Sequence, residues 1–422
     1  MTKYTKGRLW EMMNRVADMP VDVTELYLPV EEVLLESINE SFLDEINMGD
    51  FGGMKYSCMN VEQLKEYLNK ILVNYALPAH KRVKPDLIIH NKVIKKDQEG
   101  EIDVMEFKDN IIAEPSKMIT TGNAKMLKSS TDGTFTVTIG LPAFRGIVCD
   151  ITAKPIKFLI VNTCPGAGDC KTPCYARKGN YVRLPHIFLK QTRILNLLLN
   201  NPERFKEKLK DEIIALTQKK GLVGKQMRFR WNDSGDFFTE KYFNVGREIM
   251  DELKAEGYDV KPYAHTKIAS VYNANRLPAD FAGSGLSLKT DAPDFVISFS
   301  TDANPKQKKL VNLSGAKTSE IVVSEHFDDL FEKADPLRYA VDEKGKLKFK
   351  DPKNGMEILK DRISKEFGVV NDETLLSHDE MMNPEIAPES DKPIYNVIVQ
   401  TKGETDISTQ RPDVLRTFFL IH

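Results

Sequence analysis

The segment that decides the fold is Gln226-Met-Arg-Phe-Arg-Trp-Asn-Asp-Ser-Gly-Asp-Phe237, a largely alternating run that stops at a polar turn. Residues 240–256 follow with apolar side chains at helical spacing and end before Gly257, and residues 258–264 form the next run. A strand, a helix and a second strand in this order predict parallel strands joined by a covering helix.

The same alternation extends outward along the chain. Further strands are expected at 156–161, 295–299, 321–324 and 395–400, and further helices at 187–199 and 202–219. The run 134–139 also alternates like a strand, and we expect 146–152 to pair with it. Segments in the first hundred residues carry apolar side chains at helical spacing, at 9–19, 30–48 and 61–75.

The expected fold class is therefore α/β, a partial (β/α) TIM-like barrel with a helical N-terminal extension. Residues 1–125 are predicted to form a mainly helical N-terminal region. Residues 126–422 are predicted to form a metal-binding β/α partial barrel with C-terminal helix and strand additions. The apolar closing segment 414–421 is expected to pack back on the core.

Polar or titratable side chains stand where several of these strands end. In α/β folds, reactive groups gather beyond the carboxyl ends of the strands, so one shared site is expected. The predicted catalytic residues are Asp233, Asp236, His265 and Lys267, and the predicted cofactor-binding residues are Asn232, Ser234 and Asp302. The alternative for Asp236 is that it only caps the helix that begins near Thr239.

Three cysteines lie within eleven residues on a loop rich in glycine and proline, directly after the expected strand 156–161. They are Cys164, Cys170 and Cys174. Three thiolates can hold one side of a zinc site or three irons of a cubane cluster. Because no second cysteine pair is present, we expect a 4Fe-4S cluster with one open iron, with zinc as the alternative. The separate Cys149 is expected to be a core residue.

The cysteine loop and the β/α pattern resemble radical S-adenosylmethionine enzymes, which carry a cluster loop after an early strand. That resemblance implies S-adenosylmethionine as a second cofactor. The spacing here is Cys-x₅-Cys-x₃-Cys, whereas the usual family spacing is Cys-x₃-Cys-x₂-Cys. Asn232-Asp-Ser-Gly-Asp236 stands where that family carries Gly-Gly-Glu.

Two further resemblances rest on short motifs. Thr163–Ala176, Ser234–Phe238 and Tyr263–Lys267 are similar to segments of the phage-encoded gene product 88 family, whose activity is not established. This likeness covers roughly residues 155–300 and implies a phage origin. Asp233-Ser-Gly-Asp-Phe237 also resembles a strand end of guanine transglycosylases. That second likeness implies that Asp233 and Ser234 hold a base, that Asp302 is the nucleophile and that the cysteines bind zinc.

The chain has 422 residues and a net charge of −2, which is typical of a globular protein. It has neither a long apolar window nor an apolar N-terminal run, so we expect a cytoplasmic protein, in the host cytoplasm if phage-encoded, with no membrane partner. Nucleic acid or a nucleotide is the partner that the basic residues around the cysteines favour, and the alternative is that these residues only form an exposed approach to a helix. They are Lys171, Arg177, Lys178, Arg183, Lys190 and Arg193.

Three functions remain open from the sequence. The first is a phage iron-sulfur, radical-SAM-like enzyme that modifies a nucleic acid or nucleotide. The second is a zinc-containing, transglycosylase-like enzyme that exchanges a guanine-type base in DNA or tRNA. The third is a non-enzymatic module that binds nucleic acid or a host protein and uses zinc structurally.

Overall fold

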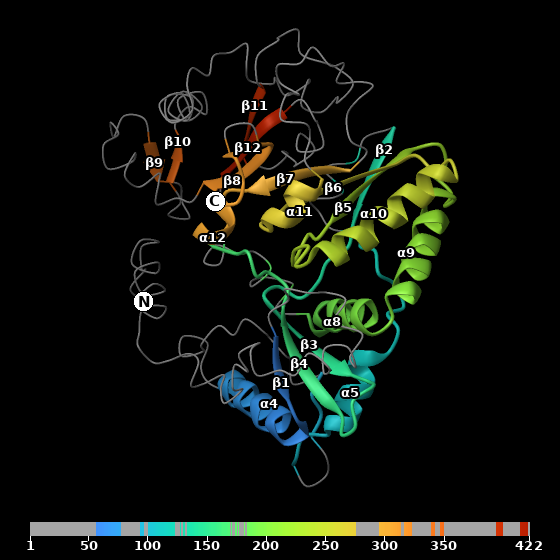
Figure 1. Cartoon of the computed structure of the whole chain (residues 1–422), viewed down its shortest axis with the longest axis vertical. Helices are drawn as coiled ribbons and strands as arrows, with labels where there is room; N and C mark the ends of the chain where they lie inside the picture. The colour runs from blue at the N-terminus through green and yellow to red at the C-terminus, as the bar shows by residue number, and fades with distance from the viewer. Residues whose placement is uncertain are drawn as a thin grey trace.

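Figure 1 shows the computed structural model of the chain. The described residues are 56–76, 93–96, 100–122, 127, 130, 133–168, 170, 174, 176, 181, 184–275, 295–313, 316–322, 339–341, 347–349, 394–399 and 414–420. The helices expected at 9–19 and 30–48 lie outside these residues.

The larger sheet has seven strands in the order β11-β12-β8-β7-β6-β5-β2, and every neighbouring pair is parallel. In chain order the strands are β2 (Thr134–Thr138), β5 (Gln226–Trp231), β6 (Val260–Thr266), β7 (Val296–Ser300), β8 (Thr318–Val322), β11 (Ile394–Val399) and β12 (Val414–Leu420). The closing segment is thus a strand, placed between β11 and β8. Within the described residues the sheet is open, with β2 and β11 at its edges, so barrel curvature stays a prediction.

Helices alternate with the strands, which confirms the α/β class. They are α8 (Pro185–Asn200), α9 (Pro202–Thr217), α10 (Glu240–Ala255), α11 (Ala269–Ala274) and α12 (Pro305–Lys308). The start of α9 is fixed by Pro202 at its first position and by the Asn201 side chain, which accepts a hydrogen bond from the Arg204 N–H at 3.1 Å. Proline and asparagine are both favoured at these places because they suit the unpaired first turn.

A smaller antiparallel sheet joins β1 (Tyr56–Met59), β4 (Lys157–Asn162) and β3 (Arg145–Asp150) in the order β1-β4-β3. Two helices belong to this part of the molecule, α4 (Val61–Ala76) and α5 (Val104–Ile112). The sheet combines strands from both sides of residue 125, and the predicted division of the chain at that point stays a prediction.

Two predictions about strand partners were wrong. The run 156–161 does form a strand, but β4 pairs antiparallel with β1 and β3 instead of opening the parallel series. Likewise β2 pairs with β5, and not with β3. The physical reason is that side-chain alternation shows an extended segment without showing its neighbour, whereas β3 and β4 are close in sequence and can pair through a short connection.

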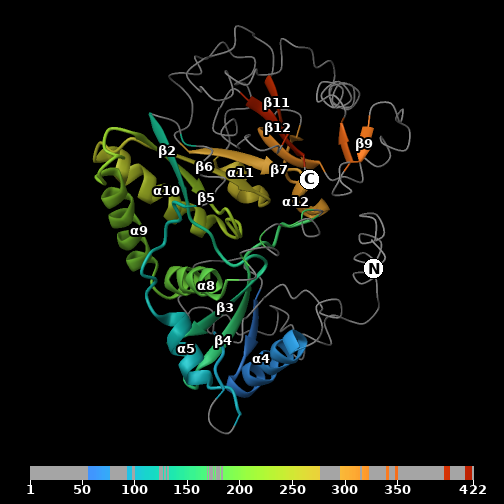
Figure 2. The ribbon, with the colours of Figure 1, turned by 180° about the vertical axis from the view of Figure 1, so that it is seen from behind.

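Helix α8 lies between the two sheets in both views (Figures 1 and 2). Its Ile194 and Leu195 belong to the core of the larger sheet, whereas its Phe188 belongs to the core of the smaller sheet. The Asn196 amide adds a polar link, since its Oδ1 accepts from the Cys149 N–H and its Nδ2 donates to the Ile147 carbonyl, each at 2.9 Å. Helix α8 therefore contributes to both cores, and so do β3 and β4, whose Val148, Leu159 and Val161 belong to the core of the larger sheet.

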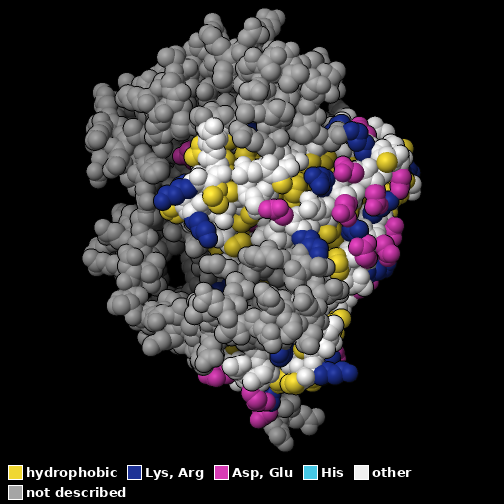
Figure 3. All heavy atoms as spheres, viewed as in Figure 1, with side chains coloured by type: hydrophobic (Ala, Val, Ile, Leu, Met, Phe, Trp, Pro, Cys, Tyr) yellow, Lys and Arg dark blue, Asp and Glu magenta, His cyan; other side chains and the backbone are white. Residues whose placement is uncertain are grey.

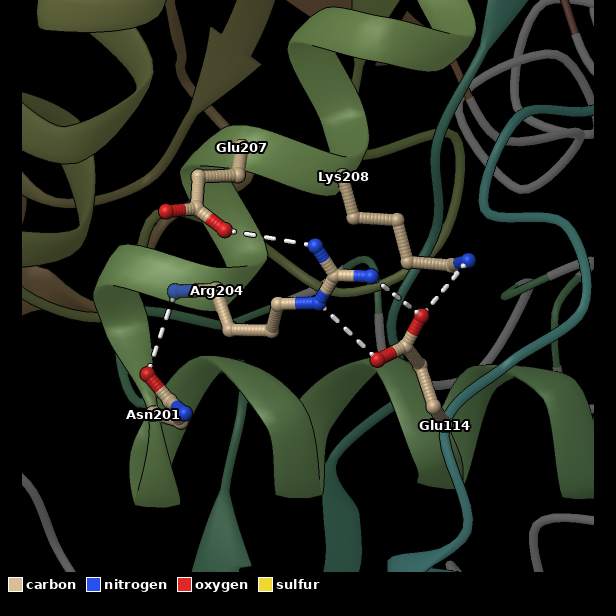
Figure 4. A network of polar contacts seen from close by, with 5 residues as sticks. All are labelled: Glu114, Asn201, Arg204, Glu207 and Lys208. Atoms are coloured by element: carbon tan, nitrogen blue, oxygen red, sulfur yellow. Dashed lines mark hydrogen bonds and ion pairs between the residues drawn. The ribbon is translucent and has the colours of Figure 1, made fainter.

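Ion pairs fasten the outer helices. Acidic and basic side chains gather at the right of the space-filling view, and the structure pairs Lys206 of α9 with Glu248 of α10 at 3.1 Å, and Lys210 with Glu252 at 2.8 Å (Figure 3). Glu114, just after α5, receives hydrogen bonds from Arg204 at 3.0 Å and lies 2.9 Å from Lys208 Nζ, both on α9 (Figure 4). Such exposed pairs orient elements more than they stabilise them.

The remaining described strands, β9 (Tyr339–Val341) and β10 (Leu347–Phe349), pair antiparallel. Across the described ranges, no helix combines the length and the apolar character that crossing a membrane requires.

Candidate metal and catalytic site

The cysteine loop lies against the carboxyl ends of β6 and β7. Ala167 forms an isolated antiparallel bridge with Ala303, and the Gly168 N–H donates to the Asp302 carbonyl at 3.0 Å. The Asn304 N–H donates to the Gly166 carbonyl at 2.8 Å. Although β4 belongs to the other sheet, the loop that follows it therefore reaches the predicted edge of the parallel sheet.

The two glycines of this loop are required by close backbone contact. A Cβ atom on Gly166 would lie 2.3 Å from the Lys267 carbonyl oxygen. A Cβ atom on Gly168 would lie 2.7 Å from the Ala303 carbonyl oxygen. Because both obstacles are backbone atoms, a side chain at either position forces the loop away from the sheet.

The three cysteines gather in one small cluster. Cys170 is buried with Phe144 and Ala167, and the partly buried Cys164 and Cys174 pack against the same group. Burial raises the pKa of Cys164 to about 12, and the neighbouring Asp236 adds to this rise. Burial also raises the pKa of Cys170, against an opposing effect of Lys267. The thiols of Cys164 and Cys170 on their own are therefore neutral, and a metal that binds them has to displace their protons.

Asp236 and Lys267 stand beside the cysteines. The Asp236 carboxylate accepts hydrogen bonds from the Phe237 N–H (2.7 Å), the Thr266 hydroxyl (2.7 Å) and the Lys267 N–H (2.8 Å). Burial raises the pKa of Asp236, and the attraction of Lys267 opposes this rise. The alternative role for Asp236 was wrong, because the Thr239 hydroxyl caps α10 by accepting from the Tyr242 N–H at 3.2 Å.

Lys267 is the charge around which this site is organised. Burial by itself lowers the pKa of Lys267, but the attraction of the Asp236 and Asp302 carboxylates, and of Cys170 and Cys164 when these are deprotonated, raises it above its ordinary value. Asp302 is buried and accepts a hydrogen bond from the Ser300 hydroxyl at 3.2 Å. The structure thus brings two predicted catalytic residues and one predicted cofactor-binding residue to the cysteines, and Lys267 stays charged there.

The other predicted residues have different neighbours. Asp233 accepts a hydrogen bond from the Tyr181 hydroxyl at 2.8 Å, and its Oδ1 occupies the space that a Cβ on Gly140 would need. Asn232 has a φ of 55° and accepts from the Tyr242 hydroxyl at 2.9 Å. His265 Nδ1 lies 3.1 Å from the Ser319 hydroxyl. Asp233 and Asp236 therefore contact different groups, in spite of their short separation in sequence.

Ser234 is buried in the turn that follows β5. Its carbonyl accepts a hydrogen bond from the Leu141 N–H at 2.8 Å. A non-glycine residue in the left-handed region, such as Asn232, is uncommon and often marks a functional turn. The polar end of β5 thus carries backbone strain beside two buried polar side chains.

Cys149 and two of the basic residues serve the structure. Cys149 is buried in the core of the smaller sheet, which confirms the expectation for it. Lys190 Nζ donates to the Ile119 carbonyl at 3.0 Å and to the Thr120 hydroxyl at 2.8 Å, and Arg193 Nε donates to the Asn110 carbonyl at 2.6 Å. These two side chains stabilise α8 contacts instead of presenting charge to a polyanion. The other four basic residues lie outside the described residues.

The sequence did not point to Thr266, Asn304 or Gly140 as parts of the site. Only the Gly-x-Gly spacing at Gly166 and Gly168 signalled a close backbone approach, without naming its partner. Across the described part of the chain, no group of three or more His, Cys, Asp or Glu side chains is arranged as a metal site. The metal assignment of the cysteines therefore rests on their chemistry and shared location.

The fold and the site define an α/β protein with an open parallel sheet, whose carboxyl edge is covered by a three-cysteine loop. The family model described as gene product 88 matches residues 117–366, which is more than half of the chain. The chain belongs to the gene product 88 family. No curated protein and no solved structure matches it, so neither the radical S-adenosylmethionine nor the transglycosylase resemblance gains support.

Proposed function

We propose that this protein is a phage iron-sulfur enzyme that modifies a nucleotide or nucleic acid at the carboxyl edge of its parallel sheet. The observation that carries the proposal is the convergence of Cys164, Cys170 and Cys174 on Lys267 and Asp236. A purely structural metal site has no need of a buried lysine and a buried carboxylate beside its thiols. Such perturbed groups are common where chemistry takes place.

The residues fit a thiolate-bound metal in their donor chemistry. Three thiols share one apolar cluster, and soft thiolates select zinc, copper(I) or iron-sulfur clusters. An iron-sulfur cluster with three protein thiolates supplies one open iron and one-electron transfer. The positive charge of Lys267 compensates part of the negative charge that deprotonated thiols bring.

The neighbouring residues have separate roles in this proposal. Asp236 orients the start of the loop after β6 through its bonds to Thr266 and to the Lys267 N–H, and its raised pKa suits a group that takes up and releases a proton. Asp302 supplies a second carboxylate that attracts Lys267. S-adenosylmethionine would be the partner of an open iron, and the sheet would curve as a partial barrel around the substrate.

Zinc at the same cysteines is the second candidate, in a transglycosylase-like enzyme or in a binding module. It is favoured by the same thiol cluster but leaves Lys267 without a role. In the transglycosylase-like version Asp233 and Ser234 would hold the base, and Asp302 would attack the sugar. The contact of Asp302 with Lys267 and the cysteines, and that of Asp233 with Tyr181, give these two carboxylates different surroundings.

Anaerobic reconstitution with iron and sulfide tests the proposal. The reconstituted protein is expected to be brown, with a broad absorption shoulder and about four irons per chain. The variant Cys170→Ser should stay folded and lose most of this iron, whereas the control Cys149→Ala should keep it, because Cys149 lies in the other core. Stoichiometric zinc without iron uptake would refute the iron-sulfur assignment. A Cys170→Ser chain that unfolds would favour structural zinc.

A further inference from the structure

The two faces of the parallel sheet differ in polarity. Met227, Phe229 and Trp231 of β5 point into the apolar core that α8, α9, α10 and α11 share. The intervening Arg228 and Arg230 lie on the opposite face. The strand register extends this second face across the sheet through Thr136, Thr138, Tyr263, His265, Ser298, Ser300, Ser319 and Thr417. Ten polar or ionisable side chains therefore line one face of a parallel sheet.

This polar face is buried, and several of its groups lack hydrogen-bond partners. Arg228 is 2% exposed and Ser298 is 1% exposed. Within the described part of the chain, Arg228 Nε and Nη1 and the Ser298 hydroxyl make no hydrogen bond. The same is true of Asn232 Nδ2 and the Ser234 hydroxyl at the end of β5. Burial lowers the pKa of Arg228, with an opposing effect from Tyr263.

A buried guanidinium without an acceptor is strongly unfavourable. The desolvation of one ion costs several kcal/mol, and proteins normally pair such a charge. The unpaired groups of Arg228 and Ser298 are donors on this polar face, whereas the Asn232 side chain turns to Tyr242 of α10 on the other side of the sheet. The described residues supply no acceptor for these buried donors, and an anion that is rich in acceptor atoms would supply it.

We propose that this face binds the phosphate group of a small-molecule ligand, with Arg228 as its main anchor. The planar fork of a guanidinium matches two phosphate oxygens, and a phosphate offers a third oxygen to further donors. Arg230 lies two residues further on the same face, about 7 Å along the strand. Ser298 lies on the same face two strands away, four residues beyond the level of Arg228, so its hydroxyl is placed to meet the part of the ligand that extends toward the carboxyl edge.

The ligand extends from this anchor toward the cysteine loop. Arg228 and Arg230 follow one another along β5 toward its carboxyl end, in a step of about 7 Å, and the strand ends at Trp231. That end is where Asp236 and Lys267 lie. A nucleotide whose phosphate binds at the arginines thus directs its sugar and base to the carboxyl edge. Its role as substrate rests on the proposed function, whereas its binding requires no metal.

Binding to the metal-free full-length chain tests the inference, measured by titration calorimetry and by thermal shift. Inorganic phosphate and GMP are expected to bind and to raise the melting temperature, and guanosine is expected to do neither. The variant Arg228→Met should weaken GMP binding by about tenfold or more, since a charge-assisted hydrogen bond is lost. Without ligand the same variant should melt at a higher temperature, because a buried charge is removed.

Two further variants separate binding from folding. Ser298→Ala should keep its fold and weaken GMP binding a few-fold, as expected for one neutral hydrogen bond. The control Arg247→Met, on the exposed side of α10, should bind GMP as the parent chain does. The inference is overturned if the parent chain binds no phosphate compound at millimolar concentration, if guanosine binds as well as GMP, or if Arg228→Met leaves GMP affinity unchanged. Binding of an oligonucleotide without any mononucleotide also overturns it.

The outcome is independent of the metal test. GMP binding together with a failure to take up iron would support this site and contradict the proposed function. Iron uptake without GMP binding would support the proposed function and contradict the phosphate site.

Discussion

Gly166→Ala perturbs the contact that brings the cysteine loop to the parallel sheet. The added Cβ would lie 2.3 Å from the Lys267 carbonyl oxygen and 2.9 Å from Ile268 Cδ1. A carbon atom approaches a carbonyl oxygen to about 3.3 Å without strain, so the loop or the end of β6 has to move by about 1 Å. The oxygen belongs to the backbone, and no side-chain rotation relieves the overlap.

The expected cost is that of overpacking a rigid site, about 2 kcal/mol. If all 422 residues unfold together, that corresponds to a fall in melting temperature of about 2 °C, and if a cooperative unit of about 150 to 250 residues unfolds by itself, to about 4 to 8 °C. Because the loop carries the cysteines, the variant should also take up less iron under anaerobic reconstitution than the parent chain. The assay is a thermal melt combined with iron analysis.

The matched control is Gly122→Ala, at an exposed position where the added Cβ meets nothing within 4 Å. It should melt within about 1 °C of the parent chain and keep full iron uptake, as most surface substitutions have small effects. A Gly166→Ala chain with unchanged melting temperature and unchanged iron content would refute the docking of the loop on β6.

Three other substitutions test single contacts. Asn196→Ala leaves the Cys149 N–H and the Ile147 carbonyl buried without their partner, so urea unfolding should show a loss of about 2 to 4 kcal/mol, and a loss below 1 kcal/mol would contradict the shared role of α8. Thr266→Val removes one hydroxyl donor from Asp236 and should cost about 1 to 3 kcal/mol, with an unchanged urea midpoint as the contrary result. Hydrogen bonds from Arg204 and Lys208 lower the pKa of Glu114 to about 2, whereas its pKa in the unfolded chain is about 4.3. Its contribution is therefore present above pH 4.3 and is lost as pH falls toward 2. Because the pair is exposed, Glu114→Gln should destabilise by less than about 1 kcal/mol at pH 7. At pH 3 the effect should be about half as large, since the unfolded carboxyl is then protonated while the folded one is still largely ionised; an equal effect at both values would exclude this titration.

Much of the α/β arrangement could be predicted from local patterns. The strand at 226–231 and the helices that begin at Pro202 and Glu240 lie where the periodicity and the capping residues place them. These features depend on neighbours in sequence, which a single sequence displays directly. The same is true of the polar strand ends, and three of them, at Asp236, Lys267 and Asp302, do converge.

The partners of the strands could not be predicted in the same way. The apolar run at 156–161 reads equally well as a parallel or an antiparallel strand, because both bury such a run. Only the pairing with β1 and β3 shows that the cysteines enter the site from the other sheet. The different surroundings of Asp233 and Asp236 have the same origin, since the contacts to Tyr181 and Thr266 span 52 and 30 residues.

The metal content of protein purified without oxygen, and without any added iron, tests the central claim most directly. The account predicts iron and acid-labile sulfide in similar amounts, approaching four of each per chain, and their absence from a Cys164→Ser, Cys170→Ser, Cys174→Ser triple variant that remains folded. Zinc at about one per chain, or iron retained by the triple variant, would contradict it.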